Sequence, residues 1–405
     1  MERFFKKESD CHFYVDKKSI PIGMPTLFSQ YTHKTLQVIE RVNLQNNFTG
    51  ETKHELQVKE IGEQTAYQIC NRLGLFLEYV DNLTNNQFIS LSVHTALPEE
   101  IINEYLNEYL IGECGKSLDA VEKHKVALDA YYNWLACYFN NKPKYLFIKT
   151  RYRPLARENS SKPLIVNYFL PRTRELFYAN AKTLLQKIVL KNGGELGCRT
   201  KENQGFLLED FKAGKQTYPG LLTLFKLMKT NPEKEEFEYF LSSIYTKYGR
   251  SRTLYIPRHL LELMEQYYKE ERPESDSNHL LVSNSNQNRG QCISVRYGSD
   301  TFEEIKKILQ EKITENPEIY DDVQEIHDEH SYHVLRHSFG TDIFYNMCQG
   351  QNKCFDSITT TSAVYIETAR RMGHKVDSKG ANQVTKRYIH SCGYREALLK
   401  ESING

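Results

Sequence analysis

The stretch from His333 to Gly340 reads His333-Val334-Leu335-Arg336-His337-Ser338-Phe339-Gly340. Positions i and i+3 lie on the same face of a helix, so the imidazole of His333 and the guanidinium of Arg336 can converge on one anionic group. His327 and His330 come shortly before, and such a group of histidines could instead hold a metal ion. We favour the anion site, because no HExxH or cysteine-rich spacing accompanies these histidines and Arg336 would repel a cation.

A second charged motif lies upstream, at Gly197-Cys198-Arg199-Thr200-Lys201-Glu202. An arginine at the start of a helix, with a glutamate one turn later to hold its guanidinium, presents a rigid two-pronged donor suited to a phosphate. The simpler interpretation is an ordinary surface ion pair between Arg199 and Glu202.

A basic turn around Gly249 precedes the extended apolar run Leu254-Tyr255-Ile256-Pro257. This pattern predicts a β-hairpin with Lys247 on the approach to its turn. Such a lysine could enter a DNA groove and deliver a proton, although exposed hairpin lysines generally have no specific role.

The last motif begins with Arg370-Arg371-Met372-Gly373-His374 and continues, after a polar loop, with Val384-Thr385-Lys386-Arg387-Tyr388-Ile389-His390. It places a histidine at a predicted helix end and then a tyrosine flanked by positive charge. The chain has 27 tyrosines, and for any one of them taken alone a packing role is the default. The order of the motifs along the chain makes Tyr388 a stronger candidate for a catalytic role than the other tyrosines.

Taken in chain order, these residues resemble the active-site signature of the tyrosine recombinases, the family of phage integrases and bacterial chromosome-dimer resolvases. The resemblance covers roughly residues 60–400 and rests on six positions: Arg199, Lys247, His333, Arg336, His374 and Tyr388. The interval from His374 to Tyr388 is longer than the family's usual one, so Tyr394 is the alternative nucleophile.

The resemblance implies a reaction that needs no cofactor and no metal. Tyr388 would attack the phosphorus, Arg199 and Arg336 would clamp the non-bridging oxygens, and His333 would act as base. Lys247 would protonate the departing 5′-hydroxyl to leave a 3′-phosphotyrosine. In the same scheme His374 would hydrogen-bond the phosphate and Glu202 would orient Arg199.

We predict a mainly α fold with a small β-sheet, built from a helical core-binding domain and a mixed α/β tyrosine-recombinase catalytic domain. Helical periodicity is expected over 65–80 and 98–110, and over 118–139 with Ser117 as N-cap. The predicted boundaries are 1–60 for an unassigned region that could be an arm-site DNA-binding module, 61–141 for the core-binding domain, 142–170 for a basic interdomain linker and 171–405 for the catalytic domain.

The net charge of +1, from 53 Lys and Arg against 52 Asp and Glu, means that affinity for nucleic acid must come from local clusters of positive charge. In the expected linker, basic residues interleave with Tyr145, Phe147 and Tyr152, as in a strap along a phosphate backbone. A solvated β-hairpin is the alternative. The candidate DNA-binding residues are Lys144, Lys149, Arg151 and Arg153.

The resemblance also implies partners: double-stranded DNA with a specific recombination site, a homodimer on that DNA and a homotetramer in synapsis. The nine cysteines have no spacing typical of zinc ribbons and are expected to be reduced. No apolar leader or run of ~18 apolar residues occurs, so we expect a soluble cytoplasmic protein, associated with the nucleoid if bacterial, with no membrane partner.

Three other functions are compatible with parts of the pattern. A type IB topoisomerase uses a closely similar residue set, and would relax supercoils without a defined site. A DNA-binding regulator with a decayed catalytic set would bind its site without forming an adduct. A metal-dependent hydrolase would use the histidines near His330.

Overall fold

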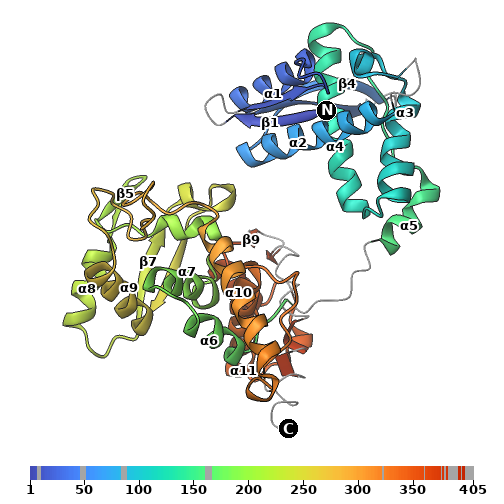
Figure 1. The fold of residues 1–405 in the computed structure, drawn as a ribbon. Helices are drawn as coiled ribbons and strands as arrows, with labels where there is room; N and C mark the ends of the chain where they lie inside the picture. Colours follow the sequence, from blue (N-terminus) through green and yellow to red (C-terminus); the bar gives the residue numbers. More distant parts are fainter. Residues whose placement is uncertain are drawn as a thin grey trace. The chain divides into compact units, whose positions relative to one another are not determined.

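The computed structural model describes residues 1–6, 11–45, 52–83, 89–159, 167–321, 323–359, 361–374, 376–377, 380–381, 391–393 and 395–396. The chain divides into two compact units, unit 1 (Met1–Leu164) and unit 2 (Ile165–Gly405) (Figure 1). Among the described residues no helix combines the length and apolar character needed to cross a membrane.

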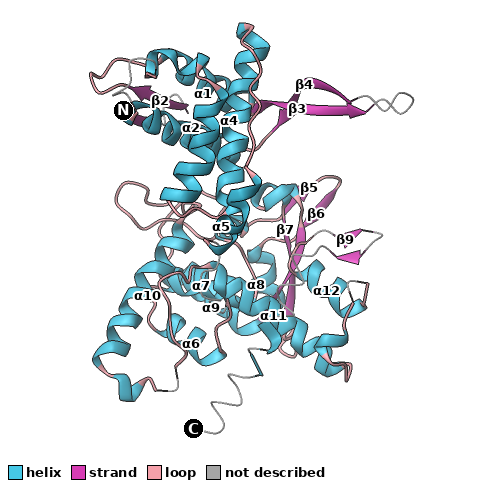
Figure 2. Cartoon of the chain, turned by 90° about the vertical axis from the view of Figure 1, so that its right-hand side faces the viewer, coloured by secondary structure: helices cyan, strands magenta, loops and turns pink. Residues whose placement is uncertain are grey.

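Unit 1 consists of helices and two separate two-stranded antiparallel sheets, β1–β2 and β3–β4. The β3–β4 ribbon extends away from the helices of this unit (Figure 2). Its elements are β1 (Glu2–Lys6), β2 (Cys11–Val15), α1 (Gly23–Thr35), β3 (Gln37–Gln45), β4 (Thr52–Glu60), α2 (Glu63–Asn82), η1 (Leu91–Ala96), α3 (Glu99–Glu104), the π-helix η2 (Tyr105–Glu113), α4 (Leu118–Phe139), η3 (Thr150–Tyr152) and α5 (Arg153–Glu158).

The predicted helices of unit 1 form with one difference, since the stretch expected over 98–110 begins as α3 and continues as the π-helix η2 to Glu113. Helix α4 begins directly after Ser117, whose hydroxyl accepts a hydrogen bond from the backbone N–H of Ala120, the N-cap arrangement that stabilises a helix start. Helix α2 buries one face against α4. These two helices contribute many of the residues of the hydrophobic core of unit 1.

The first 60 residues are part of the same unit rather than a separate module. Tyr14, Phe28 and Val38 are buried in one hydrophobic cluster with the residues of α2 and α4. The hydroxyl of Tyr14 donates to the carbonyl of Cys70 on α2 at 2.7 Å. The boundary expected near residue 60 therefore does not separate two cores.

Residues 142–159 differ from the expected linker, and also from the alternative hairpin, because they form no strand and pack on unit 1. Leu146 and Ile148 are buried in its core. The side chain of Asn103 accepts from the N–H of Phe147, and that of Asn107 from the N–H of Lys149. These hydrogen bonds hold the backbone of residues 145–149 in an extended conformation, in which Tyr145 and Phe147 face outward.

Unit 2 is built around α7, which packs against α6, α9, α10 and α11. Its elements are α6 (Pro171–Ala179), α7 (Leu184–Glu195), η4 (Thr200–Gly205), β5 (Phe211–Ala213), β6 (Gln216–Tyr218), α8 (Leu221–Thr230), β7 (Glu236–Leu241), η5 (Ser243–Tyr245), η6 (Lys247–Gly249), β8 (Arg252–Pro257), α9 (Arg258–Glu270), α10 (Tyr297–Glu315), η7 (Pro317–Ile319), α11 (His333–Gly350), η8 (Phe355–Ser357), α12 (Ala363–Arg371), β9 (Val376–Asp377) and β10 (Gly380–Ala381).

The predicted hairpin is the antiparallel pair β7–β8, with Leu241 opposite Arg252 at the loop end and Glu236 opposite Pro257 at the far end. Helices α9 and α12 contact β8. The predicted fold class, mainly α with small antiparallel sheets, is confirmed: each sheet among the described residues has two strands. None of the nine cysteines is bonded to another in the structure.

Candidate active site

Arg199 lies at the start of the short helix η4, as the sequence predicts. Its guanidinium is 2.6 Å from Oε1 of Glu202, and the Glu202 carboxylate also accepts from the backbone N–H of Arg199 at 3.0 Å. The Arg199 side chain keeps 25% of its surface exposed, whereas Glu202 is fully buried. A buried carboxylate thus holds a guanidinium that solvent, or a phosphate, can reach.

Arg336 reaches the same carboxylate from α11. Its Nη1 is 3.7 Å from Oε2 of Glu202, and its guanidinium donates to the carbonyl oxygens of Gly197 and Met372. Only 1% of the Arg336 side chain is exposed. The two arginines expected to act on one phosphate, far apart in the sequence, are therefore brought to opposite oxygens of one carboxylate, with Arg336 beneath the surface.

Gly197 makes this approach possible. Its φ of +60° lies in the left-handed region, and an added Cβ would come within 2.4 Å of the Phe339 ring. Any side chain here would displace Phe339, which follows Arg336 by one turn of α11. The carbonyl that receives Arg336 is held in place by this backbone conformation.

Arg252 is a third arginine of the cluster, and none of the sequence motifs indicated it. Its Nη2 lies 2.8 Å from Oε2 of Glu202 and donates to the carbonyl of Gly197 at 3.1 Å, while its Nη1 donates to the carbonyls of Leu196 and Arg371. The side chain is 3% exposed. Arg252 therefore ties β8 to the loop before η4 and to the end of α12.

A signal for Arg252 was present in the sequence. On a strand, residues i, i+2 and i+4 face the same side, and Arg252 shares its face with Leu254 and Ile256, which are both buried. An arginine in register with two core aliphatics must bury its charge, so it needs a buried acid. Glu202 is that acid.

The three arginines control the ionisation of Glu202. Burial by itself raises the pKa of the carboxyl, but the charges of Arg252, Arg336 and Arg199 outweigh it and lower the pKa to about 2. The carboxylate stays ionised at neutral pH. One negative charge then faces three positive ones, which leaves the cluster with excess positive charge next to the surface.

His333 and His374 lie in the field of this cluster. The pKa of His374 is lowered to about 3, first by burial and then by the charges of Arg336, Arg199 and Arg252. The pKa of His333 is lowered in the same way, with Lys247 among the charges that act on it, although more than a third of His333 is exposed and solvent moderates the effect. Both imidazoles are therefore neutral at pH 7.

Local structure positions these two histidines and the lysine. His333 opens α11, with its ring 4.6 Å from that of His337. His374 follows Gly373, whose φ is +65° and whose added Cβ would meet the Arg252 side chain at 2.8 Å. Lys247 is exposed in the loop of the hairpin, on η6.

A cleft of about 750 Å³ opens beside His374, between the hairpin loop and the end of α12. Its lining includes Arg250, Arg370 and Arg371, with Glu367 as its acidic residue. The guanidinium of Arg371 lies over the Tyr255 ring, 4.6 Å from its centre. The cleft continues the excess positive charge of the cluster to the surface, which suits a polyanion.

The expected nucleophile Tyr388 and its alternative Tyr394 lie outside the described residues, as does the stretch 382–390 around Tyr388. Residues 391–393 and 395–396 are described. Arg395 lies 3.0 Å from Asp342, and Cys392 is buried against Phe344. These contacts tie the described part of the C-terminal segment to α11.

The histidines upstream of His333 have structural contacts. Nδ1 of His330 accepts a hydrogen bond from the backbone N–H of His327 at 3.0 Å, and its ring packs edge-on against Phe169. Across the described part of the chain, neither belongs to a group of three metal-ligating side chains. The metal interpretation of this region thus gains no support.

Comparisons with known proteins yielded structural matches only, since no family model and no curated protein matches the chain. The chain is similar to the Tn1549 transposon integrase (residues 82–397) in complex with circular intermediate DNA, with 14% identity, 79% of this chain and 87% of that chain covered and a TM-score of 0.44. It is also similar to a lambda integrase (75–356) dimer bound to a COC′ core site, with 12% identity, 82% and 90% covered and a TM-score of 0.46.

A third similar structure is the integrase from mycobacterium phage Brujita, with 15% identity, 82% and 84% covered and a TM-score of 0.29. All three of these solved structures are integrases.

Proposed function

We propose that this protein is a site-specific DNA recombinase of the tyrosine recombinase family, which cleaves and rejoins DNA through a 3′-phosphotyrosine intermediate. One observation carries the proposal: the carboxylate of Glu202 holds the guanidinium groups of both Arg199 and Arg336. Strand exchange needs positive charge gathered at one phosphorus, and this cluster supplies it on rigid elements.

In the proposed reaction the phenolic oxygen of Tyr388 attacks the scissile phosphorus, the bond to the 5′-oxygen breaks, and Lys247 gives that oxygen a proton. His333 takes the proton from Tyr388, since its imidazole is neutral and can accept one. A second 5′-hydroxyl then attacks the phosphotyrosine. The number of phosphodiester bonds is unchanged, so the reaction needs neither ATP nor metal.

The two clamping arginines take different positions in this scheme. Arg199 contacts the phosphate from the surface, because a quarter of its side chain is accessible. Arg336 lies beneath the surface and contributes its positive charge from there. It contacts the phosphate directly when the guanidinium gives up its hydrogen bonds to the carbonyls of Gly197 and Met372 and donates to phosphate oxygens instead. His374, beside the basic cleft, donates to the phosphate.

The neutral state of the two histidines suits the proposed reaction. A DNA phosphate brings negative charge next to His333 and His374, which offsets the field of the arginines and raises the pKa of both imidazoles. Each histidine gains proton affinity when the substrate arrives, as an acid or base of the reaction must.

Unit 1 would contact the DNA backbone through the outward face of residues 142–158. Lys149 and Arg151 lie 3.5 and 3.3 Å from Glu108, and Arg153 is exposed at the start of α5. Such exposed ion pairs contribute little and readily give way to phosphates. Lys144 completes this set.

The partners we propose are double-stranded DNA with a specific recombination site, a second protomer on that DNA, and a tetramer in synapsis.

The central experiment uses a DNA duplex selected from a random library by binding to the full chain, and then nicked so that cleavage traps the covalent product. Wild-type protein should form an adduct that resists denaturant. Tyr388→Phe should bind the duplex with unchanged affinity and form no adduct, because the attacking oxygen is gone.

Tyr394→Phe is the matched control and should form the adduct normally. If Tyr394→Phe abolishes the adduct and Tyr388→Phe does not, Tyr394 is the nucleophile. If the adduct persists in both single variants and in the double variant, the phosphotyrosine mechanism is wrong. Intact binding without any adduct by wild-type protein would favour a DNA-binding regulator.

A second measurement separates this reaction from metal-dependent hydrolysis. Adduct formation should proceed in excess EDTA without added divalent ions, since side chains supply the charge and the protons. DNA binding is measured in the same buffer, so that an effect of EDTA on binding is distinguished from one on cleavage. Loss of cleavage with intact binding would favour a metal-dependent enzyme.

A further inference from the structure

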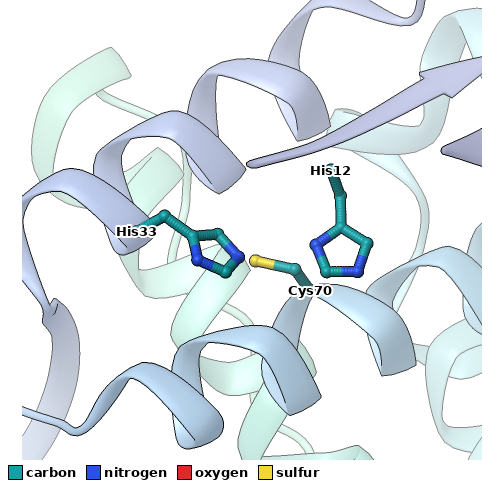
Figure 3. A group of neighbouring side chains, drawn as sticks. All are labelled: His12, His33 and Cys70. Carbon is teal, nitrogen blue, oxygen red and sulfur yellow. The ribbon is translucent and has the colours of Figure 1, made fainter. Parts of the chain in front are cut away.

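A second buried group of polar side chains lies in unit 1. His12 on β2, His33 on α1 and Cys70 on α2 are 2%, 8% and 0% exposed. The potential ligand atoms of the three side chains all lie within 4.8 Å of one another. One ring nitrogen of each histidine points toward the Cys70 sulfur (Figure 3).

One of these nitrogens lacks a hydrogen bond. Nδ1 of His12 is buried and makes none, although the backbone N–H of the same residue donates to Ser29 at 2.7 Å. The rings of Phe5 and Tyr67 pack against the imidazole, with ring centres 5.1 and 4.8 Å from its own. A buried polar atom left in this state costs about 1–3 kcal/mol, so the fold carries a cost that a ligand would remove.

The ionisation of the group suits a cation. Burial lowers the pKa of His12 to about 4, so its imidazole is neutral and keeps a lone pair for coordination. Burial raises the pKa of the Cys70 thiol to about 12, against hydrogen bonds from Ser29 and Tyr14 that lower it. A metal ion replaces the thiol proton and compensates the charge of the thiolate, which burial otherwise disfavours.

We propose that His12, His33 and Cys70 bind one Zn²⁺ ion that ties β2, α1 and α2 together. Two imidazoles and a thiolate are ligands of a borderline-soft ion and not of Ca²⁺ or Mg²⁺. Around tetrahedral zinc, ligand atoms lie about 3.5 Å apart, so the three side chains close by roughly an ångström when they bind it. Because the described His, Cys, Asp and Glu residues add no fourth ligand to this group, a water molecule completes the coordination.

A nearby positive charge is compensated. Arg3 contributes to the lowered pKa of His12 and so lies within its electrostatic reach. Its guanidinium, however, donates to the carbonyl of Asn71 at 2.9 Å and lies 3.6 Å from Glu78. The charge of Arg3 is thus paired on the outer side of α2.

The role of this metal is structural, and it explains how the first strands stay on the helices. The ligands come from three elements whose sequence spacing matches no short metal motif, which is why the cysteine pattern did not reveal them. A bound ion cross-links them and adds its binding free energy to the stability of unit 1.

The test uses the full chain, purified without added metal or chelator, and readouts independent of DNA cleavage. Elemental analysis should find about one zinc per chain. After replacement of zinc by Co²⁺, the protein should show the near-ultraviolet absorption of a thiolate–cobalt bond. Trp134, the single tryptophan, is buried in the core of unit 1, so its fluorescence should report a lower melting temperature after EDTA treatment.

Cys70→Ser should lose the zinc and the cobalt band. Cys137→Ser, which changes an exposed cysteine on α4 of the same unit, should keep both. If Cys70→Ser does not fold, the wild-type metal content and cobalt spectrum still decide. Wild-type protein without metal and without a cobalt band would overturn the proposal, as would an unchanged band in Cys70→Ser; copper in place of zinc would overturn the choice of ion.

Discussion

Unit 2 gathers three guanidinium groups around one buried carboxylate, whereas unit 1 buries two imidazoles next to a thiol. In unit 2 the partners carry opposite charges, so the protein itself compensates the cost of burial. In unit 1 burial lowers the pKa of His12, which is therefore neutral at pH 7, and its Nδ1 makes no hydrogen bond. The first cluster offers surplus positive charge to a substrate, while the second has lone pairs to offer the proposed cation.

The largest expected effect comes from breaking the charge balance of unit 2. Glu202→Gln leaves buried guanidinium groups without their counter-charge, and loss of one partner of a buried ion pair costs about 3–5 kcal/mol. Urea unfolding followed by far-ultraviolet circular dichroism should show this loss. The Trp134 fluorescence transition, which reports unit 1, should stay in place.

Glu108→Gln is the matched control, because Glu108 makes its two ion pairs at the surface of unit 1. It should change stability by less than about 1 kcal/mol. An equal cost for both substitutions would show that the charges of the Glu202 cluster are not held out of water as the structure indicates.

Acid should separate the two units by the pH at which each loses stability. The pKa of Glu202 is lowered from 4.5 to about 2, so its ionised form stabilises the folded state fully above pH 4.5, and this stability is lost as the pH falls toward 2. The shift corresponds to about 3 kcal/mol. Burial lowers the pKa of His124 in unit 1 from 6.5 to about 4, so the unfolded chain takes up the proton first, and this stability is lost between those two values.

Urea unfolding at a series of pH values tests the two windows. Trp134 fluorescence should report the loss between pH 6.5 and 4, and circular dichroism a further loss below pH 4.5 that Glu202→Gln abolishes. A second loss that persists in Glu202→Gln would assign it to other carboxylates.

The smallest effect concerns Arg252, which we regard as a positioning residue because it acts on Glu202 and on the backbone rather than on substrate. Arg252→Met keeps most of the side-chain volume but leaves hydrogen-bond acceptors unpaired, at a cost of about 1–3 kcal/mol. Because Arg252 is the largest charge that lowers the pKa of Glu202, the acid transition should also move to higher pH.

Arg252→Lys restores the charge and should return the acid transition toward its wild-type pH. A lysine cannot replace the several hydrogen bonds of the guanidinium, so adduct formation should be slower than in the wild type. A merely structural role would reduce stability in Arg252→Met without moving the pH of the transition. That result would show that Arg252 is not a positioning residue of the active site.

Features with a short sequence spacing could be predicted from the sequence. The bond between Arg199 and Glu202 follows from their i, i+3 positions at a helix start, and helix α4 begins at Ser117 because a serine there can cap it. The hairpin that carries Lys247 and the helix end before His374 were predicted on the same grounds. Each depends on neighbours within a few residues, which helical and strand periodicity encode.

Features that join distant elements were decided by the tertiary structure. The sequence orders Arg199, Arg336 and His374 along the chain, but only the packing of α7, α11 and α12 brings both guanidinium groups to Glu202 and places His374 in their field. The same holds for Arg252, and for His12 with Cys70, whose convergence leaves no trace in local spacing. Periodicity fixes which face a side chain occupies, whereas its partners depend on which faces the hydrophobic core brings together.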